Sequence, residues 1–385
     1  MINRLMILCS RLNPNSRDLS EIENILESEL DWKRLLKKAA DERVGPLLYH
    51  NLKKFKNQIP ESAMEGLKKA YYLNTARNNY KYKKLEPLLE AIHDSRLRVA
   101  VIKGARLAKT LYPDIGLRPF TDVDLVVHPS DWSQLEKVFE KLGFSGDEYV
   151  KQFLNNTKEE LYWTFSPLYQ KDRLMVELHF NYPGLGIPIR LDKDLWESSQ
   201  NIEILDTEAR SFSLEYELCI LCLHAQQHAY NRLIWLTDIA ELLSQERIDW
   251  ERVIYLCQEE EICAPVYYGL KLVDCFWPGT VSKNILARFK LSPFERKFLR
   301  YFWPEERILS RELCFKFPWK TPTFFPLLSR KRIFLKSRIL FNIFFPPRAW
   351  VSYYYHIPAN SIKIFSHYLW RLYTSLWLFS KLFIR

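Results

Sequence analysis

Two aspartates, Asp122 and Asp124, are separated by a single residue in an otherwise apolar segment. They alternate with Val123, Leu125 and Val127, so a strand here would place both carboxylates on one face and the apolar residues on the other. Carboxylates two residues apart on a strand lie about 7 Å from each other, a spacing that suits a hard cation such as Mg²⁺. Because protein-bound Mg²⁺ keeps water and substrate phosphates as its other ligands, the pattern predicts phosphoryl or nucleotidyl transfer.

A third carboxylate of such a site must come from a neighbouring strand. In the segment 174–180, Glu177 and His179 alternate with apolar residues and would share one face of a strand. We expect Asp122 and Asp124 to hold the metal ions, and Glu177 to join one of them and to help deprotonate an acceptor hydroxyl. The predicted catalytic and metal-binding residues are therefore Asp122, Asp124 and Glu177.

The elements that must position these carboxylates can be predicted from the apolar pattern around them. A buried strand at 99–102 is followed by a glycine turn at Gly104 and by a helix at 105–112. A second helix at 132–142 should end at Gly143, which suits a helix C-terminus. Further strands are predicted at 161–165, 168–170 and 174–180.

These motifs resemble those of the uncharacterised nucleotidyltransferase family within the DNA polymerase β superfamily. The matching residues are Lys103-Gly104, Tyr112-Pro113, Leu117-Arg118-Pro119 and Asp122-Val123-Asp124. The resemblance implies an α+β fold, in which a polymerase β-like mixed sheet carries flanking helices and is joined by N- and C-terminal helical regions. It also implies transfer of a nucleoside monophosphate from a nucleoside triphosphate (NTP) to an acceptor, with Mg²⁺ or Mn²⁺ as cofactor and pyrophosphate as product.

The chain departs from the family pattern at two positions. Gly104-Ala105 stands where the family has glycine–glycine or glycine–serine, and the third acid is Glu177 where the family more often has aspartate. One extra methylene moves that carboxylate by about one bond length, which a flexible metal shell can accept.

Several basic and polar residues are candidates for binding the nucleotide. Lys103 and Arg118 could neutralise phosphates, and the planar fork of Arg118 suits a phosphate group best. The alternative is that Lys103 is an ordinary surface lysine and that Arg118 has a structural role. The predicted nucleotide-binding residues are Lys103, Gly104, Arg118, Thr121, His228 and Arg232.

His228 and Arg232 belong to a polar stripe in the segment 215–243, which we expect to form one long helix. The stripe is spaced by three and four residues and consists of His224, His228, Arg232, Trp235 and Asp238. It is predicted to face the nucleotide, with a helix-packing network as the alternative. A zinc site is disfavoured because no glutamate lies between the two histidines.

Two other functions share parts of this pattern. Glycosyltransferases that hold a nucleotide-sugar diphosphate also use Asp-x-Asp, but a longer alternation of strands and helices should precede it, and residues 15–95 are predicted to be helical instead. A protein that binds nucleotides without turning them over is the second alternative.

Composition and charge divide the chain. We predict an N-terminal helical region at 1–95, a nucleotidyltransferase core at 96–210, a C-terminal helical domain at 211–312 and a basic aromatic tail at 313–385. The tail holds 12 Lys and Arg and no acidic residue, whereas residues 1–312 hold the other 44 basic and all 46 acidic residues. Its prolines predict short helices and extended pieces.

The tail and the cysteines suggest where the protein acts. Trp and Tyr beside Lys and Arg suit peripheral contact with an anionic membrane surface, and the alternative is that the aromatic residues pack back on the protein. Charges interrupt the apolar run at 362–384, so a membrane span is not expected. Seven cysteines without a signal-like N-terminus favour reduced thiols and a cytoplasmic location.

Overall fold

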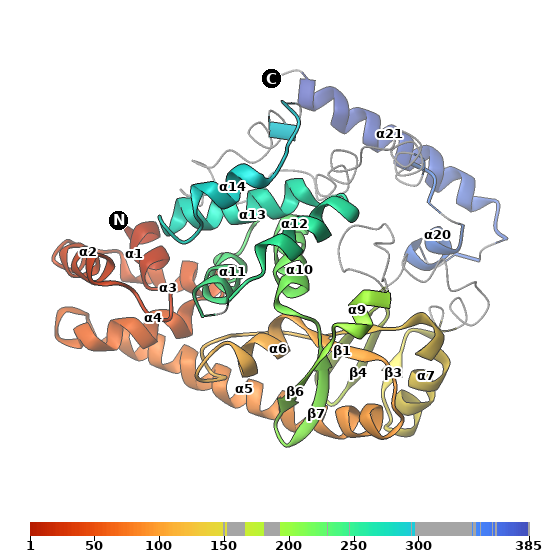
Figure 1. Cartoon of the computed structure of the whole chain (residues 1–385), viewed down its shortest axis with the longest axis horizontal. Helices are drawn as coiled ribbons and strands as arrows, with labels where there is room; N and C mark the ends of the chain where they lie inside the picture. Colours follow the sequence, from red (N-terminus) through yellow and green to blue (C-terminus); the bar gives the residue numbers. More distant parts are fainter. Residues whose placement is uncertain are drawn as a thin grey trace.

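The protein is built of a helical N-terminal part, a mixed sheet and a second set of helices (Figure 1). The computed structural model describes residues 1–148, 151, 166–180, 193–228, 230–245, 247–293, 295–296, 341, 344–346, 348–355, 357–358 and 360–383. The strand predicted at 161–165 and the part of the tail from 313 to 340 lie outside these ranges.

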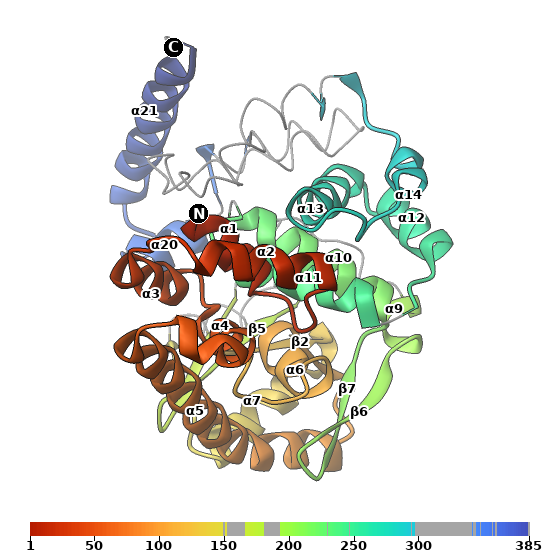
Figure 2. The same cartoon turned by 90° about the vertical axis from the view of Figure 1, so that its left-hand side faces the viewer.

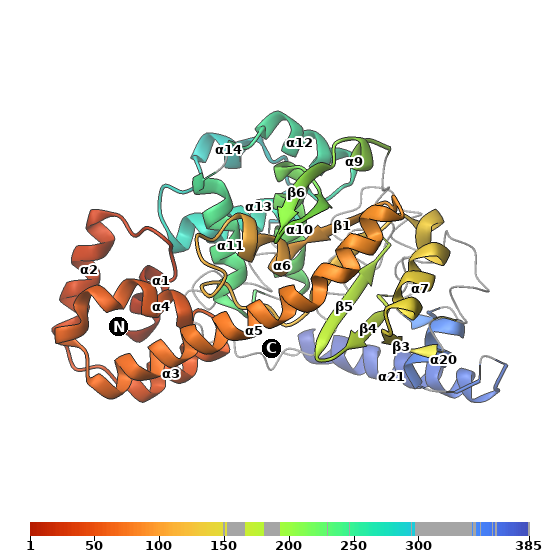
Figure 3. The same ribbon diagram turned by 90° about the horizontal axis from the view of Figure 1, so that it is seen from below.

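The N-terminal part is helical, as predicted. Asp31 caps one of its helices, because its Oδ1 accepts a hydrogen bond from the backbone N–H of Arg34 at 2.9 Å. The long helix α5 starts after Pro60 and runs along one side of the sheet (Figure 3). The helices are α1 (Ile2–Leu8), α2 (Ser16–Leu26), α3 (Trp32–Asp41), α4 (Gly45–Leu52), the 3-10 helix η1 (Lys53–Gln58) and α5 (Glu61–Asp94).

Among the described residues, seven strands form one mixed sheet in the order β3-β4-β5-β2-β1-β7-β6. β2 pairs with β1 antiparallel and with β5 parallel, and the register sets Asp124 opposite Glu177. This sheet with its flanking helices confirms the predicted α+β class. The strands are β1 (Val99–Ile102), β2 (Val123–Val127), β3 (Ser145–Gly146), β4 (Leu168–Lys171), β5 (Leu174–His179), β6 (Gln200–Ile204) and β7 (Thr207–Ser211).

The two faces of the sheet pack into different cores, which fixes the direction of the carboxylates. Val123, Leu125 and Val127 join the core that includes α5. Val126, which shares the face of Asp124, joins the core of the N- and C-terminal helices. The alternation predicted for β2 is therefore correct, and Asp124 faces the helical side of the molecule.

The remaining helices differ from the predictions in three places. The segment predicted as one helix at 215–243 forms α10 and α11 instead, and the connection includes Tyr230 with a left-handed backbone (φ 55°). The helix predicted at 105–112 begins two residues earlier, as α6. The other helices are α6 (Lys103–Thr110), η2 (Pro129–Asp131), α7 (Trp132–Lys141), α9 (Lys193–Glu197), α10 (Leu214–Gln227), α11 (Leu233–Gln245), α12 (Trp250–Glu259), α13 (Cys263–Phe276), α14 (Lys283–Arg288), α20 (Arg348–Tyr355) and α21 (Lys363–Phe383).

The third difference is in the tail, where α21 is 21 residues long rather than a short piece. No proline follows Pro358, so nothing of that kind interrupts the helix. Helix α21 lies at the edge of the molecule (Figure 1), and in Figure 2 it projects beyond the helical body. Over the part of the chain that the structure describes, no helix combines the length and apolar character needed to cross a membrane.

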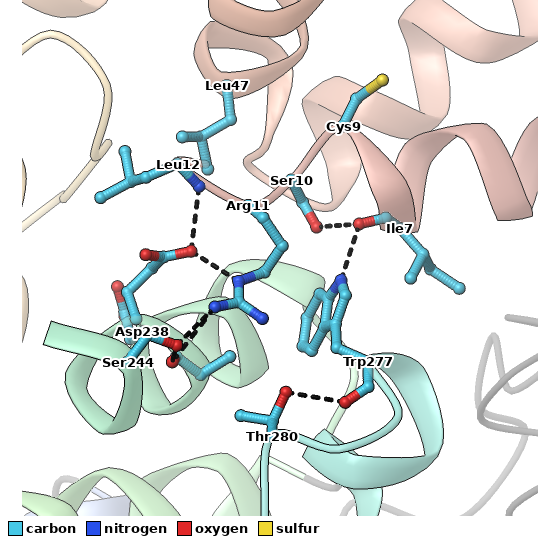
Figure 4. A network of polar contacts seen from close by, with 12 residues as sticks. Ile7, Cys9, Ser10, Arg11, Leu12, Leu47, Asp238, Ser244, Trp277 and Thr280 are labelled. Carbon is cyan, nitrogen blue, oxygen red and sulfur yellow. Dashed lines mark hydrogen bonds and ion pairs between the residues drawn. The ribbon is translucent and has the colours of Figure 1, made fainter. Parts of the chain in front are cut away.

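The N- and C-terminal helices share one hydrophobic core, and a buried polar clamp joins them. Glu241 of α11 accepts hydrogen bonds from Arg11 Nε at 2.6 Å and from the Leu12 N–H at 2.9 Å. Trp277 Nε1 donates to the Ile7 carbonyl at 3.0 Å (Figure 4). The segment that leaves α1 is therefore fixed against α11.

Replacement of Glu241 by alanine should lower the thermal unfolding midpoint by several degrees, because Arg11 and the Leu12 N–H would lose a buried acceptor. Breaking a buried pair in this way costs about 3 kcal/mol or more, whereas the half-exposed pair Arg4–Glu21 should contribute about 1 kcal/mol or less. Thermal unfolding of Glu241→Ala and of the matched helix variant Glu21→Ala measures the difference. Equal midpoints for the two variants would contradict the role of the clamp.

Candidate active site

A polar cleft of about 300 Å³ lies between the sheet and the helices, and all nine residues predicted from the sequence line it. They come from the first turn of α6, from β2 and the segment that leads into it, from β5 and from the connection between α10 and α11. The lining consists of Arg43, Lys103, Gly104, Arg118, Phe120, Thr121, Asp122, Asp124, Ser166, Glu177, His179, His224, Gln227, His228, Asn231, Arg232 and Trp235.

Asp124, Glu177 and His179 form the tightest group of potential ligands in the cleft. One atom from each lies within 4.8 Å of the others, because β2 and β5 pair in parallel with Asp124 opposite Glu177. His179 Nε2 is 2.8 Å from Asp124 Oδ1 and 3.8 Å from Glu177 Oε2. Asp122 also lines the cleft, but this close group contains His179 in its place.

Lys103 forms a buried ion pair with Asp124. Its Nζ lies 2.6 Å from Asp124 Oδ1, and both side chains are almost fully buried. The Lys103 backbone is left-handed (φ 54°), and its N–H donates to the buried Glu217 of α10 at 3.0 Å. The ammonium is therefore held against a site carboxylate, whereas the sequence predicted that it would contact nucleotide phosphates.

The predicted glycine turn is made by Lys103, and Gly104 serves a different purpose. Gly104 does not have a positive φ, but a Cβ atom there would lie 2.8 Å from Phe120 Cβ and 2.9 Å from Arg118 Nη1. Those distances are shorter than real contacts, so the residue must be small. Gly104 lets the start of α6 pack closely against the segment that precedes β2.

The surroundings of Asp124 and Glu177 shift the pKa values of these two carboxyl groups in opposite directions. Burial alone would raise the pKa of Asp124, but Lys103 and His179 outweigh it, and the pKa lies well below its usual value. The pKa of Glu177 is raised, mainly by burial, although His179 and Lys103 oppose the shift. Asp124 is therefore a permanent anion, whereas Glu177 is the better proton acceptor of the two.

Arg118 is committed to Asp238 of α11 rather than left open to the cleft. Its Nε and Nη2 lie 3.1 and 2.5 Å from the two oxygens of Asp238, and its Nη1 donates to the Pro119 carbonyl at 2.6 Å. Tyr112 also donates to Asp238, at 2.8 Å. The motif residues Tyr112 and Arg118 thus hold α11 against the core, and phosphate binding by Arg118 stays a prediction.

Three aromatic rings, from His224, His228 and Trp235, form one cluster at the helical wall of the cleft. Their centroids are 4.7 to 5.0 Å apart. Burial is the main cause that lowers the pKa of His224 well below its usual value and that of His228 to about 4. Both histidines are therefore neutral at pH 7 and add no positive charge to the cleft.

The donors in the close group fit a divalent cation. Two carboxylates and an imidazole lie close enough together to bind the same ion. Among the described residues, the Glu177 carboxylate makes no hydrogen bond, so its oxygens are available as ligands. Carboxylates suit Mg²⁺ and Mn²⁺, and an imidazole shifts the preference toward transition metals. Asp124, Glu177 and His179 are the residues that would hold the ion.

Sequence reasoning missed three residues that shape the cleft. His179 was recognised only as a neighbour of Glu177 on one strand face, although the Glu-x-His spacing was visible. Glu217 and Arg43 carry no local signal, because each reaches the site from a segment distant in sequence. Arg43, at the junction of α3 and α4, approaches Thr121 Oγ1 to 3.5 Å.

Comparison with solved structures adds a distant likeness. An antigenic nucleotidyltransferase-like protein from Paracoccidioides brasiliensis shares 20% identity over 54% of this chain and 92% of its own, with a TM-score of 0.36. A likeness this distant carries no argument about the present site. No curated protein matches the chain.

Family comparison covers most of the described fold, including every residue of the cleft. The sequence profile of an uncharacterised nucleotidyltransferase family matches residues 28–278. That range spans well over half of the chain, from α3 to the helices behind the cleft. The resemblance inferred from the motifs is thereby confirmed, and the chain belongs to the uncharacterised nucleotidyltransferase family.

Proposed function

We propose that the cleft transfers a nucleoside monophosphate from an NTP to an acceptor hydroxyl and releases pyrophosphate. The observation that carries the proposal is the group formed by Asp124, Glu177 and His179, which two adjacent parallel strands hold in register within a cleft. Family membership supports the same reaction class. The acceptor class, whether small molecule, glycan, peptide, protein or RNA, is the open part of the proposal.

The residues of the cleft divide the work of the reaction. A divalent cation, Mg²⁺ or Mn²⁺, bound by the close group would supply positive charge to the phosphate oxygens. Glu177, whose pKa burial raises, accepts the proton of the acceptor hydroxyl. That oxygen bonds to the α-phosphorus, and the bond from the α-phosphorus to the bridging oxygen breaks. Pyrophosphate leaves with the electron pair.

A nucleotide-binding module without turnover is the second candidate, and one observation favours it. Lys103 Nζ forms an ion pair with Asp124 Oδ1 at 2.6 Å. The lysine therefore already neutralises the carboxylate that a metal ion would need. The glycosyltransferase alternative gains no such support, because helices α1–α5 stand where that class needs strands before its Asp-x-Asp. Nucleotide consumption separates the first two candidates.

Asp124→Asn should reduce nucleotidyl transfer by about 10²-fold or more, because it removes the permanent anion of the close group. The assay incubates the chain with labelled ATP, CTP, GTP and UTP, host extract and Mg²⁺ or Mn²⁺, and follows label on an acceptor. A melting curve of each variant controls for folding. Transfer at wild-type rate by folded Asp124→Asn would exclude this site.

Glu177→Gln should lower turnover while the dissociation constant for the nucleotide changes little, because the proton acceptor is lost but the cations of the cleft remain. Glu177→Asp, which keeps the carboxylate, should retain part of the activity. Calorimetry and the transfer assay give the two quantities. Loss of nucleotide binding with normal turnover of bound nucleotide would remove Glu177 from the catalytic role.

We propose separately that α21 contacts an anionic membrane surface. Phe365, Leu369, Tyr373 and Trp377 recur every four residues and are about half exposed or more, so they form one stripe on the helix. The other side packs on the tail, where Ile364 is buried and the hydroxyl group of Tyr368 bonds to a backbone carbonyl. An exposed aromatic stripe in a segment without acidic residues suits an interfacial helix.

The double variant Leu369→Asn/Tyr373→Asn should lose most binding to vesicles that contain phosphatidylserine, because it interrupts the apolar stripe. Sedimentation with these vesicles should also weaken as salt rises, since the basic residues are screened. Tyr72→Asn, at an exposed aromatic residue of α5, is the matched control and should bind normally. Equal sedimentation of all three proteins, or no binding by the wild type, would contradict membrane contact.

A further inference from the structure

Two arginines from segments far apart in the sequence line the same cleft. Arg43 comes from the junction of α3 and α4, and Arg232 from the start of α11, yet both line the same cavity as the carboxylates. Glu42 joins the two segments, because its side chain accepts a hydrogen bond from the Leu233 N–H at 2.6 Å and its carbonyl one from Ile234 at 3.3 Å. The neighbours of Arg43 and Arg232 are therefore held together.

The backbone fixes Arg43 in an unusual conformation. Its φ is 59°, a left-handed value that costs free energy for a residue with a Cβ atom. Among the described contacts, its guanidinium reaches only Thr121, whose hydroxyl in turn donates to Asp122 at 2.6 Å. Arg232 lies over the Trp235 ring at 5.3 Å. Within the described ranges, neither arginine forms an ion pair with a carboxylate.

No ion pair therefore compensates this pair among the described residues, and the charge of Asp122 acts on Arg43 only as a weaker opposing influence. Burial, and then the charges of Arg232 and Arg118, lower the pKa of Arg43 to about 10. The other cations that line the cleft are already committed, Lys103 to Asp124 and Arg118 to Asp238. Like charges gathered in a cavity are unfavourable unless an anion joins them, so a ligand with several negative charges fits this place.

We infer that Arg43 and Arg232 form a polyphosphate subsite, which binds the β- and γ-phosphates of the nucleotide. Guanidinium groups match phosphate oxygens with two parallel hydrogen bonds. Thr121 lies between Arg43 and Asp122, and its hydroxyl connects the subsite to the carboxylate side of the cleft. The subsite also stabilises the charge that develops on departing pyrophosphate.

This inference rests on the proposed nucleotidyl transfer for its meaning, but the anion binding can be measured alone. The probe is inorganic triphosphate, titrated by calorimetry into the full chain with a chelator present so that no metal ion contributes. The wild type should bind it. Arg43→Ala and Arg232→Ala should each weaken binding about tenfold or more, since each removes charge-assisted hydrogen bonds. Arg43→Lys should recover only part of the affinity.

Arg96→Ala is the matched control. Arg96 also has a left-handed backbone (φ 52°), so alanine there has the same local effect on the chain, but it lines a different cavity between α5 and the sheet. Its affinity for triphosphate should equal that of the wild type. Melting curves verify that all variants are folded.

The outcomes separate the subsite from the reaction. No triphosphate binding by the wild type, or equal affinities of Arg43→Ala and Arg96→Ala, would overturn the subsite, even if transfer were then observed. Triphosphate binding that depends on Arg43 and Arg232 supports it. If triphosphate bound in this way but no nucleotide was consumed, the result would contradict the proposed transfer and still support the subsite.

Discussion

The Asp124 carboxylate is the point on which the site depends. It is almost fully buried at the floor of the polar cleft, and a buried charge must be compensated by partners. Lys103 and His179 supply that compensation at 2.6 and 2.8 Å. The Lys103 backbone is left-handed (φ 54°), and its N–H donates to Glu217 at 3.0 Å. One buried carboxylate thus links the sheet, the start of α6 and the helix α10.

The same constraint explains why the helical regions matter to the site. Helix α10 carries Glu217 and ends beside the cleft, and α11 carries Asp238, which holds Arg118 and Tyr112. The N-terminal segment is clamped to α11 by Glu241. Arg43 reaches the cleft from this N-terminal part. The cleft is therefore completed by segments that precede and follow the sheet in sequence, and the family match at 28–278 includes Arg43, α10 and α11.

Local patterns predicted the parts of this arrangement that local forces decide. Alternation in β2 and β5 depends on one buried face, so Asp124, Glu177 and the strands around them could be identified from the sequence. The predicted stop at Gly143 follows from the chemistry of helix ends. The break between α10 and α11 could not be predicted in this way, because the helical spacing of its side chains continues across it.

Tertiary contacts decide the remaining features. The partner of Lys103 and that of Arg118 depend on which carboxylate lies nearby in the folded chain, and Arg43 is about 80 residues from the aspartates in sequence. Periodicity contains no information on such pairs. The prolines of the tail predict short helices, but all of them precede residue 359, so α21 is longer than this pattern predicts.

The fate of the nucleotide phosphates distinguishes nucleotidyl transfer from hydrolysis and from binding without turnover. Each NTP is incubated with the chain, a divalent cation and host extract, and phosphorus NMR follows the products. Nucleotidyl transfer releases one pyrophosphate for each nucleoside monophosphate that is attached to an acceptor, so we expect the two products in equal amounts. Release of inorganic phosphate with a nucleoside diphosphate, or tight binding of every NTP with no product at all, would contradict it.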